Sequence, residues 1–243
     1  MRIAILADIH GNLEALSAVL ADAQKRDAAD SVWCLGDTVG YGPDPRACID
    51  TLLGTSPVAV AGNHDWAIVG KVSLREFNPY AALACRWTLA QLSPAHIDYL
   101  VNLPLQVERG PFTLVHGSPR DPIWEYLVSL TSARACFQHL STPYCLVGHS
   151  HVPFMCREGQ GTPEMVELPG NTTIPLGEER LIVNPGSVGQ PRDGDPRASY
   201  AIYHQEESSL EIRRVSYDLR ATQRKMRLAG LPEPLAERLQ YGR

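Results

Sequence analysis

The chain has 243 residues, of which 44% are hydrophobic and 20% charged, and its formal net charge is −5 at pH 7. This is the composition of an ordinary soluble globular protein, and it carries no overall basic field that would indicate an extended nucleic-acid surface. No run approaches the roughly 18 apolar residues of a membrane span, and Asp8 and His10 come too early for a signal peptide. Six well-separated cysteines without a C-x-x-C pair predict reduced thiols in a cytoplasmic protein.

The first third of the chain alternates predicted strands and helices. Apolar strands are expected at 2–8, 31–37 and 57–65, with helices at 12–27 and 44–54 between them. Asn12 is a suitable N-cap for the first helix, and Gly54 closes the second. The βαβαβ order predicts parallel strands joined by right-handed crossovers.

The pattern turns helical from Pro79 to about Leu100, and the second half consists mostly of strands. These are expected at 112–118, 144–150, 154–158, 180–187, 199–204 and 210–217. Gly and Pro separate them, as in antiparallel hairpins. We expect a single domain over 1–243, with a helical insertion at about 66–103 and a charged helical tail at about 218–243.

Side chains that bind metal ions stand at the ends of the predicted strands. They are Asp8, His10, Asp37, Asn63, His64, His116, His149 and His151, which include five of the eight histidines. The carboxyl ends of parallel strands are where ligands bind, so we expect these side chains to converge. Two pairs, Asp8/His10 and His149/His151, have i, i+2 spacing, which in an extended chain points both side chains to one site. Nitrogen and oxygen donors without cysteine suit Mn, Fe, Zn, Co or Ni rather than Ca.

The motifs D-x-H, G-D, G-N-H-D, H-G and G-H-x-H, in this order over residues 8–151, resemble the calcineurin-like metallophosphoesterase family. The segment 183–202 resembles the bacterial phosphodiesterase-type branch and extends the likeness to about residue 204. The resemblance implies an α/β fold: a four-layer α/β/β/α sandwich of two facing mixed sheets with flanking helices.

The resemblance also implies two divalent metal ions, with Mn favoured. It places one ion on Asp8, His10 and His151, the other on Asn63, His116 and His149, and Asp37 between the two. With a bridging hydroxide the metals and their carboxylates carry a charge of about +1, which attracts an anionic phosphate. His64 is implied to contact the phosphoryl group or to protonate the leaving alkoxide.

One motif departs from related phosphatases. Phosphoprotein phosphatases and symmetrical dinucleoside-tetraphosphate hydrolases read G-D-x-V-D-R-G where this chain has Gly40 and Tyr41 in place of the acid and the arginine. A dianionic monoester loses more from a missing arginine clamp than a diester does. Arg120 or Arg192 could restore a clamp from another loop, and the turn around Ser187 could offer backbone N–H groups to phosphate. Each of these could equally be a surface or turn residue.

We therefore expect a dinuclear metal-dependent phosphoesterase, a hydrolase that cleaves phosphodiester bonds by in-line attack of a metal-bridging hydroxide with help from His64. The alternatives are a phosphomonoesterase, a protein phosphatase or a dinucleoside-polyphosphate hydrolase on the same scaffold. A non-catalytic protein-binding scaffold is disfavoured because every ligand position is filled. The expected substrate is a small phosphate ester or a nucleotide, with no membrane partner.

Overall fold

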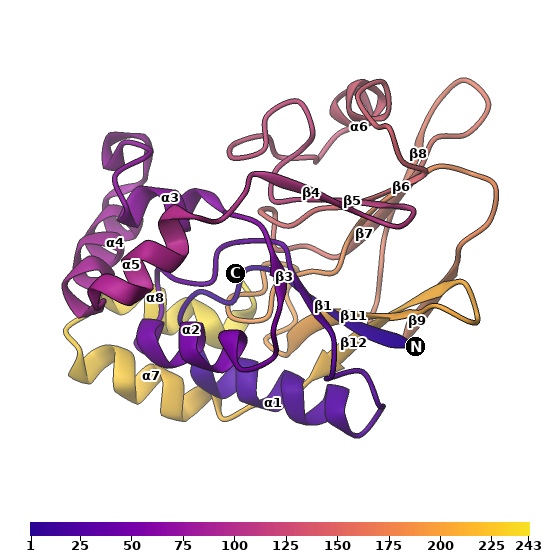
Figure 1. Ribbon diagram of the computed structural model, residues 1–243. Coiled ribbons are helices and arrows are strands. Elements are labelled where there is room, and N and C mark those ends of the chain that lie inside the picture. Colours follow the sequence, from indigo (N-terminus) through magenta and orange to yellow (C-terminus); the bar gives the residue numbers. More distant parts are fainter.

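Two six-stranded mixed sheets face each other in the computed structural model, which describes residues 1–243 (Figure 1). The strands are β1 (Arg2–Leu6), β2 (Val32–Cys34), β3 (Val58–Ala59), β4 (Gln106–Arg109), β5 (Phe112–Val115), β6 (Tyr144–Leu146), β7 (Phe154–Arg157), β8 (Glu164–Glu167), β9 (Thr172–Pro175), β10 (Leu181–Asn184), β11 (Ala198–His204) and β12 (Ser209–Val215). The first sheet has the order β3-β2-β1-β11-β12-β9, and the second has the order β4-β5-β6-β10-β7-β8. β1, β2 and β3 are parallel, as predicted.

The largest hydrophobic core lies between the two sheets. Phe112 of β5 contacts Trp33 of β2 and Tyr203 of β11, with ring centroids 5.5 and 4.8 Å apart. Ile5 and Leu114, which are fully buried, come from opposite sheets and join the same core. Each such side chain contributes about 1.5–3 kcal/mol by burial, so this interface holds the two sheets in a fixed relation.

Helices cover the outer faces of the sheets and one end of the molecule (Figure 1). They are α1 (Leu13–Gln24), α2 (Pro45–Leu53), α3 (Asn63–Ile68), α4 (Pro79–Gln91), α5 (Pro94–Val101), α6 (Leu130–Phe137), α7 (Leu219–Leu228) and α8 (Glu233–Glu237), with short 3₁₀ turns η1 (Leu74–Glu76) and η2 (Arg238–Tyr241). α1 packs Leu16 and Val19 against the first sheet, and α6 packs Phe137 against the second. The expected four-layer α/β/β/α architecture is therefore confirmed. No helix is both long and apolar enough to cross a bilayer.

Several elements differ from the predicted ones. The third strand is limited to Val58–Ala59, because the chain turns at Gly62 and enters α3. The strands β4, β8 and β9 and the helix α6 were not predicted. The three strands are largely exposed and lie at sheet edges, β4 and β8 in the second sheet and β9 in the first. The second half is also only partly antiparallel, since β5, β6 and β10 pair in parallel. All six cysteines are buried and unpaired.

Candidate metal centre and catalytic cleft

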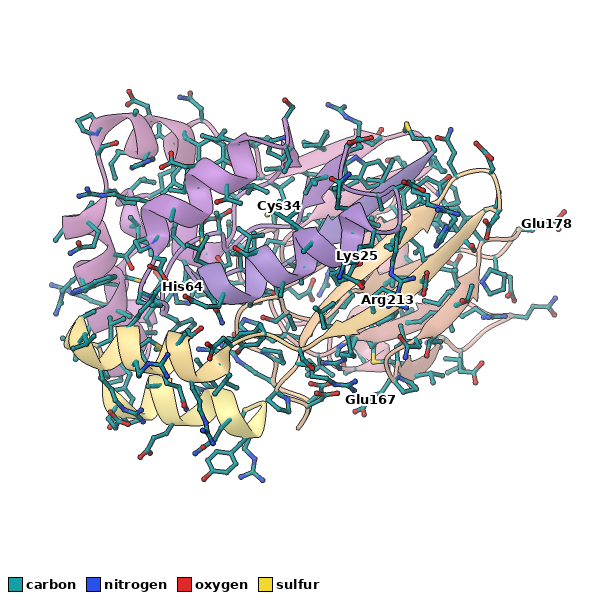
Figure 2. All side chains as sticks on the ribbon, turned by 90° about the horizontal axis from the view of Figure 1, so that it is seen from below. Lys25, Cys34, His64, Glu167, Glu178 and Arg213 are labelled. Carbon is teal, nitrogen blue, oxygen red and sulfur yellow. The ribbon has the colours of Figure 1, made fainter.

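The loops that follow β1, β2, β5 and β6, together with the start of α3, bring the predicted metal-binding side chains into one buried cluster. β1 ends two residues before Asp8, and β6 ends three residues before His149. The cluster consists of Asp8, His10, Asp37, Asn63, His64, His116, His149 and His151, each no more than 4% exposed. Side chains from five separate segments thus meet at the end of the sheets where the insertion helices lie. Figure 2 shows His64 at this helical end, opposite Glu178.

The first group of donors consists of Asp8, His10 and His151. The Nε2 atoms of His10 and His151 are 3.1 Å apart. Asp8 Oδ1 lies 3.4 Å from Nε2 of His151 and 4.0 Å from Nε2 of His10. Donors held about 2.0–2.2 Å from one cation lie about 3–3.5 Å from each other, so this spacing fits a single ion.

The second group shares His116 as its centre. Nε2 of His116 is 3.1 Å from both Asn63 Oδ1 and His149 Nδ1. Asp37 lies between the two groups, because its Oδ2 is 3.6 Å from Nε2 of His10 and 3.5 Å from Nε2 of His116. One carboxylate oxygen is therefore within reach of both groups of donors.

Backbone carbonyls select the ring nitrogen that three of the histidines offer. In three histidines the Nδ1 atom lies against a carbonyl oxygen: His10 at 3.2 Å from Val39, His116 at 2.8 Å from Leu35, and His151 at 2.6 Å from Gln190. Nδ1 must then carry the proton, which leaves the Nε2 lone pair free to bind a cation. The donor set and its tautomers therefore fit two divalent ions.

The backbone of the site adopts a strained conformation. Six of its residues have positive φ: Asp8 (53°), His10 (49°), Asp37 (53°), Tyr41 (59°), His149 (65°) and His151 (60°). Non-glycine residues in this region cost about 1–3 kcal/mol each, and such strain concentrates at functional sites. The expectation of extended i, i+2 pairs is thus wrong in its geometry. Asp8 and His10 do meet in one group, but His149 and His151 turn to different groups.

Burial controls the charges of the cluster. It raises the pKa of Asp37 to about 7 and that of Asp8 well above its usual range, because loss of water outweighs the attraction of Arg192. Burial also lowers the pKa of His116 to about 4 and that of His149 well below its ordinary value. Neutral imidazoles are the form that binds metal, and a bound cation would favour both ionised carboxylates.

Asp65 holds two of the loops together. Its carboxylate accepts hydrogen bonds from the N–H groups of Gly62 (3.0 Å) and Val39 (3.3 Å). Its carboxylate therefore joins the loop after β2 to the start of α3. A side chain at Gly62 would collide with the carboxylate of Asp37, so this close approach requires glycine. The sequence did not predict that Asp65 joins these two loops.

A cleft of about 100 Å³ opens beside the cluster. Besides five of the cluster residues, it is lined by Tyr41, Glu76, Phe77, Asn78, Trp124, Tyr126 and Arg192. Tyr126 stacks on the ring of His149 at 3.8 Å, and the Nε2 atom of that histidine is buried without a hydrogen-bond partner. Phe77 and Asn78 come from the insertion and had no signal in the sequence. Aromatic rings and one guanidinium thus form the rim.

Two of the three residues expected to contact substrate lie elsewhere. Arg120 pairs with Glu125 and does not line the cleft. The hydroxyl of Ser187 is fully buried and donates to the Asp8 carbonyl at 2.9 Å, so it supports the loop after β1 instead of binding substrate. Arg192 does line the cleft, with its guanidinium 6.0 Å over the ring of Tyr41.

Comparison with known proteins agrees with this geometry. Residues 1–208 match the family model of the calcineurin-like phosphoesterase superfamily domain. The chain belongs to the calcineurin-like phosphoesterase superfamily. Members are hydrolases that act on phosphate esters, and the buried His/Asp groups described above are candidate metal sites of this member.

Two similar proteins span the whole chain, and a third spans part of it. A crystal structure of a metallophosphoesterase from Sphaerobacter thermophilus superposes with a TM-score of 0.90 at 46% identity, covering 100% of both chains. The uncharacterized protein MJ0912 of Methanocaldococcus jannaschii is 38% identical over 99% of this chain and 98% of its own length. A symmetrical bis(5'-nucleosyl)-tetraphosphatase of Thioalkalivibrio sulfidiphilus is 30% identical over 58% of this chain, which spans about half of that protein (52%).

Proposed function

We propose that this superfamily member is a dinuclear metal-dependent phosphodiesterase. The observation that carries the proposal is the position of Asp37 Oδ2, within 3.6 Å of a donor nitrogen in each of the two groups. A single oxygen so placed suits a ligand shared by two cations. When bound, two such cations would polarise the phosphoryl oxygens and lower the pKa of the attacking water.

The residues proposed to hold the cations divide as the two groups do. One cation is assigned to Asp8, His10 and His151, the other to Asn63, His116 and His149, and Asp37 serves both. The ligand chemistry suits Mn, Fe, Zn, Co or Ni, and we favour Mn. A donor nitrogen of His64 also lies within 4.8 Å of donor atoms of His10 and Asp37. We nevertheless assign His64 a different role, since its Nδ1 contacts Cys85 and its ring lines the cleft.

His64 is proposed to hold a proton at Nε2 for the phosphoryl oxygen or the leaving oxygen. Its main-chain N–H donates to Asp37 Oδ1 at 2.8 Å, which ties the helix bearing the imidazole to the shared carboxylate. The ring lies between Tyr41 and Phe77, with centroids 4.4 and 4.9 Å away, so it has little freedom to rotate. Burial lowers the pKa of His64 well below its ordinary value, so the ring is neutral, and an imidazole held in this way can donate a hydrogen bond from Nε2 without prior reorganisation.

Arg192 supports a preference for diesters over monoesters. It is the only arginine that lines the cleft, and one of its amino groups already donates to Gln190 at 2.9 Å. A dianionic monoester is best held by a fully available bidentate guanidinium, whereas a diester carries one charge fewer. With Tyr41 at the position of the motif arginine, the cleft offers a single, partly engaged cation.

The second candidate is hydrolysis of a dinucleoside polyphosphate, suggested by the tetraphosphatase to which part of the chain is similar. The narrow cleft of about 100 Å³ disfavours it, because sites for ligands of that size measure several hundred Å³. A small phosphate ester or a nucleotide that enters by its phosphoryl end fits the cleft better.

The test is a substrate panel with Mn²⁺-loaded protein. It compares a bis-aryl phosphate, a mono-aryl phosphate, cyclic nucleotides, a phosphopeptide and a dinucleoside tetraphosphate. We expect the highest kcat/KM for diesters and its loss in Asp37→Asn. A higher kcat/KM for the monoester or the tetraphosphate would replace the proposal with that activity. Two bound metal ions without turnover of any substrate would indicate a non-catalytic scaffold.

A further inference from the structure

The imidazole of His64 has one hydrogen-bonding partner in the protein, the thiol of Cys85. The Sγ atom lies 3.3 Å from Nδ1, within hydrogen-bonding distance for sulfur. Cys85 is 1% exposed and does not line the cleft, whereas His64 does. The two ring nitrogens therefore have separate surroundings: Nδ1 faces a buried thiol, and Nε2 is left for the cleft.

The loop after β2 cannot supply this partner. Gly40 has a φ of +91°, and a Cβ atom there would stand 2.5 Å from His64 Nδ1, closer than nonbonded atoms approach. In the related phosphatases an acidic residue stands at this position of the motif. In this protein the backbone of Gly40 lies directly against the His64 ring. An acidic side chain at position 40 would therefore collide with the ring in its present position.

Cys85 is held in position by the helical insertion. It lies on α4, a helix that begins at Pro79 and is capped by Asn78, whose side chain accepts from the Ala81 N–H at 3.0 Å. It belongs to a buried apolar core that also contains Ile68 of α3, the helix that carries His64. The thiol and the imidazole are thus fixed to two helices that pack against each other.

We propose that Cys85 is a positioning residue for His64: its thiol donates a hydrogen bond to Nδ1 and so keeps the imidazole proton on Nε2, facing the cleft. This inference rests on the proposed function, in which the Nε2–H group donates a hydrogen bond to the phosphoryl or leaving oxygen while the ring stays neutral. A thiol can donate one proton, and a ring nitrogen that accepts it must be unprotonated. The opposite arrangement would present a bare lone pair to the substrate.

The chemistry of the buried thiol supports this direction of donation. Burial, with Asp37 and Asp65 nearby, raises the pKa of Cys85 well above its ordinary value, so the sulfur keeps its proton. A neutral thiol also adds no charge beside the cations. An acidic partner, by contrast, would raise the pKa of the imidazole and hold it charged.

Kinetics of three variants test the positioning role. Cys85→Ala should lower kcat for a bis-aryl phosphate about 5- to 10-fold, the factor expected for losing one hydrogen bond, with KM and metal content unchanged. Cys85→Ser should recover most of the loss, since a hydroxyl also donates. Cys48→Ala, at another buried cysteine outside the site, is the matched control and should keep wild-type kcat. Melting temperatures show that each variant folds.

A double mutant separates positioning from general damage. In the His64→Ala background, Cys85→Ala should have no further effect on kcat, because the group on which it acts is gone. The same fold-loss in both backgrounds would overturn the proposal and make Cys85 a packing residue. No loss in Cys85→Ala, or no recovery in Cys85→Ser, would overturn it as well.

Nitrogen-15 NMR of the His64 ring in metal-free protein gives a readout that needs no turnover. The wild type should show Nε2 protonated and Nδ1 bare, and Cys85→Ala should shift this tautomer balance towards Nδ1–H. A wild-type ring protonated at Nδ1 would overturn the inference. If the panel of phosphate esters yields no turnover while the tautomer is as expected, the proposed function fails and the thiol–imidazole assignment stands.

Discussion

Asp37→Asn should stabilise the metal-free protein at about pH 8 and abolish its stabilisation by metal. Burial raises the pKa of Asp37 from 3.8 to about 7. Between these values the folded chain holds a proton that the unfolded chain has released, so the free energy of unfolding falls as the pH rises. At about pH 8 the carboxylate is charged in both states, and about 3 pKa units at ~1.4 kcal/mol each make the full cost about 4 kcal/mol.

The surroundings of Asp37 suit an asparagine when no metal is present. Oδ1 accepts the His64 N–H, and an amide oxygen can do the same. Oδ2 faces the Nε2 atoms of His10 and His116, whose Nδ1 protons are engaged by backbone carbonyls. Both Nε2 atoms are therefore acceptors, and an amide NH₂ group would supply a hydrogen to each. A bridging ligand for two cations would be lost in the same change.

Thermal unfolding with a chelator and with Mn²⁺, at about pH 5 and about pH 8, measures both effects. With chelator at the higher pH, the variant should melt about 8–16 °C above the wild type, because 1 kcal/mol shifts the Tm of a chain of this size by roughly 2–4 °C and the full cost is about 4 kcal/mol. At the lower pH the gap should narrow, since the folded wild type is then protonated. With Mn²⁺ the wild type should have the higher melting temperature, because only the wild type binds the ion well.

Asp65→Asn is the matched control for this experiment. Its carboxylate is equally buried, but it accepts two backbone N–H groups, of which an amide can keep only one. Burial raises the pKa of Asp65 to about 7 as well, so removing its charge offsets part of the lost hydrogen bond; we expect a smaller stability gain at about pH 8 than in Asp37→Asn, and an intact response to Mn²⁺. The reasoning is refuted if Asp37→Asn melts below the wild type in chelator at about pH 8, or if it still binds two metal ions.

Three further outcomes are expected. His64→Ala should lower kcat about 10²–10⁴-fold, the range for a lost acid–base group, while elemental analysis still finds two metal ions; one missing ion would make His64 a ligand. Arg192→Ala should raise KM for a bis-aryl phosphate about 10-fold, whereas Arg120→Ala, outside the cleft, should leave KM unchanged; equal effects would contradict the placement of Arg192. Gly40→Ala should displace the His64 ring and reduce kcat at least 10-fold with little change in metal content, and wild-type kcat would show that the ring can move aside.

Much of the architecture could be predicted because it depends on local pattern. Apolar runs and helical spacing predicted β1, β2, α1 and α2, and their alternation predicted parallel pairing. The donor residues could be found in the same way, since metal binding needs particular side chains and strand ends are where they accumulate. Edge strands such as β4 escaped prediction, because β4 places only Val107 against the core, and one apolar residue makes no alternation to detect.

What the sequence by itself determined is the family and the set of candidate donor residues; what only the tertiary structure decided is how the backbone holds these residues and which other residues support them. The i, i+2 spacing of His149 and His151 does not encode their separation into two groups: Asp8 and His10 have the same spacing and also positive φ, yet they meet in one group, so the donors that each loop meets in the fold make the difference. The contact of Cys85 with His64 joins residues 21 positions apart on two helices. Such contacts depend on which helices pack against each other, and the periodic pattern of each helix does not specify its partner.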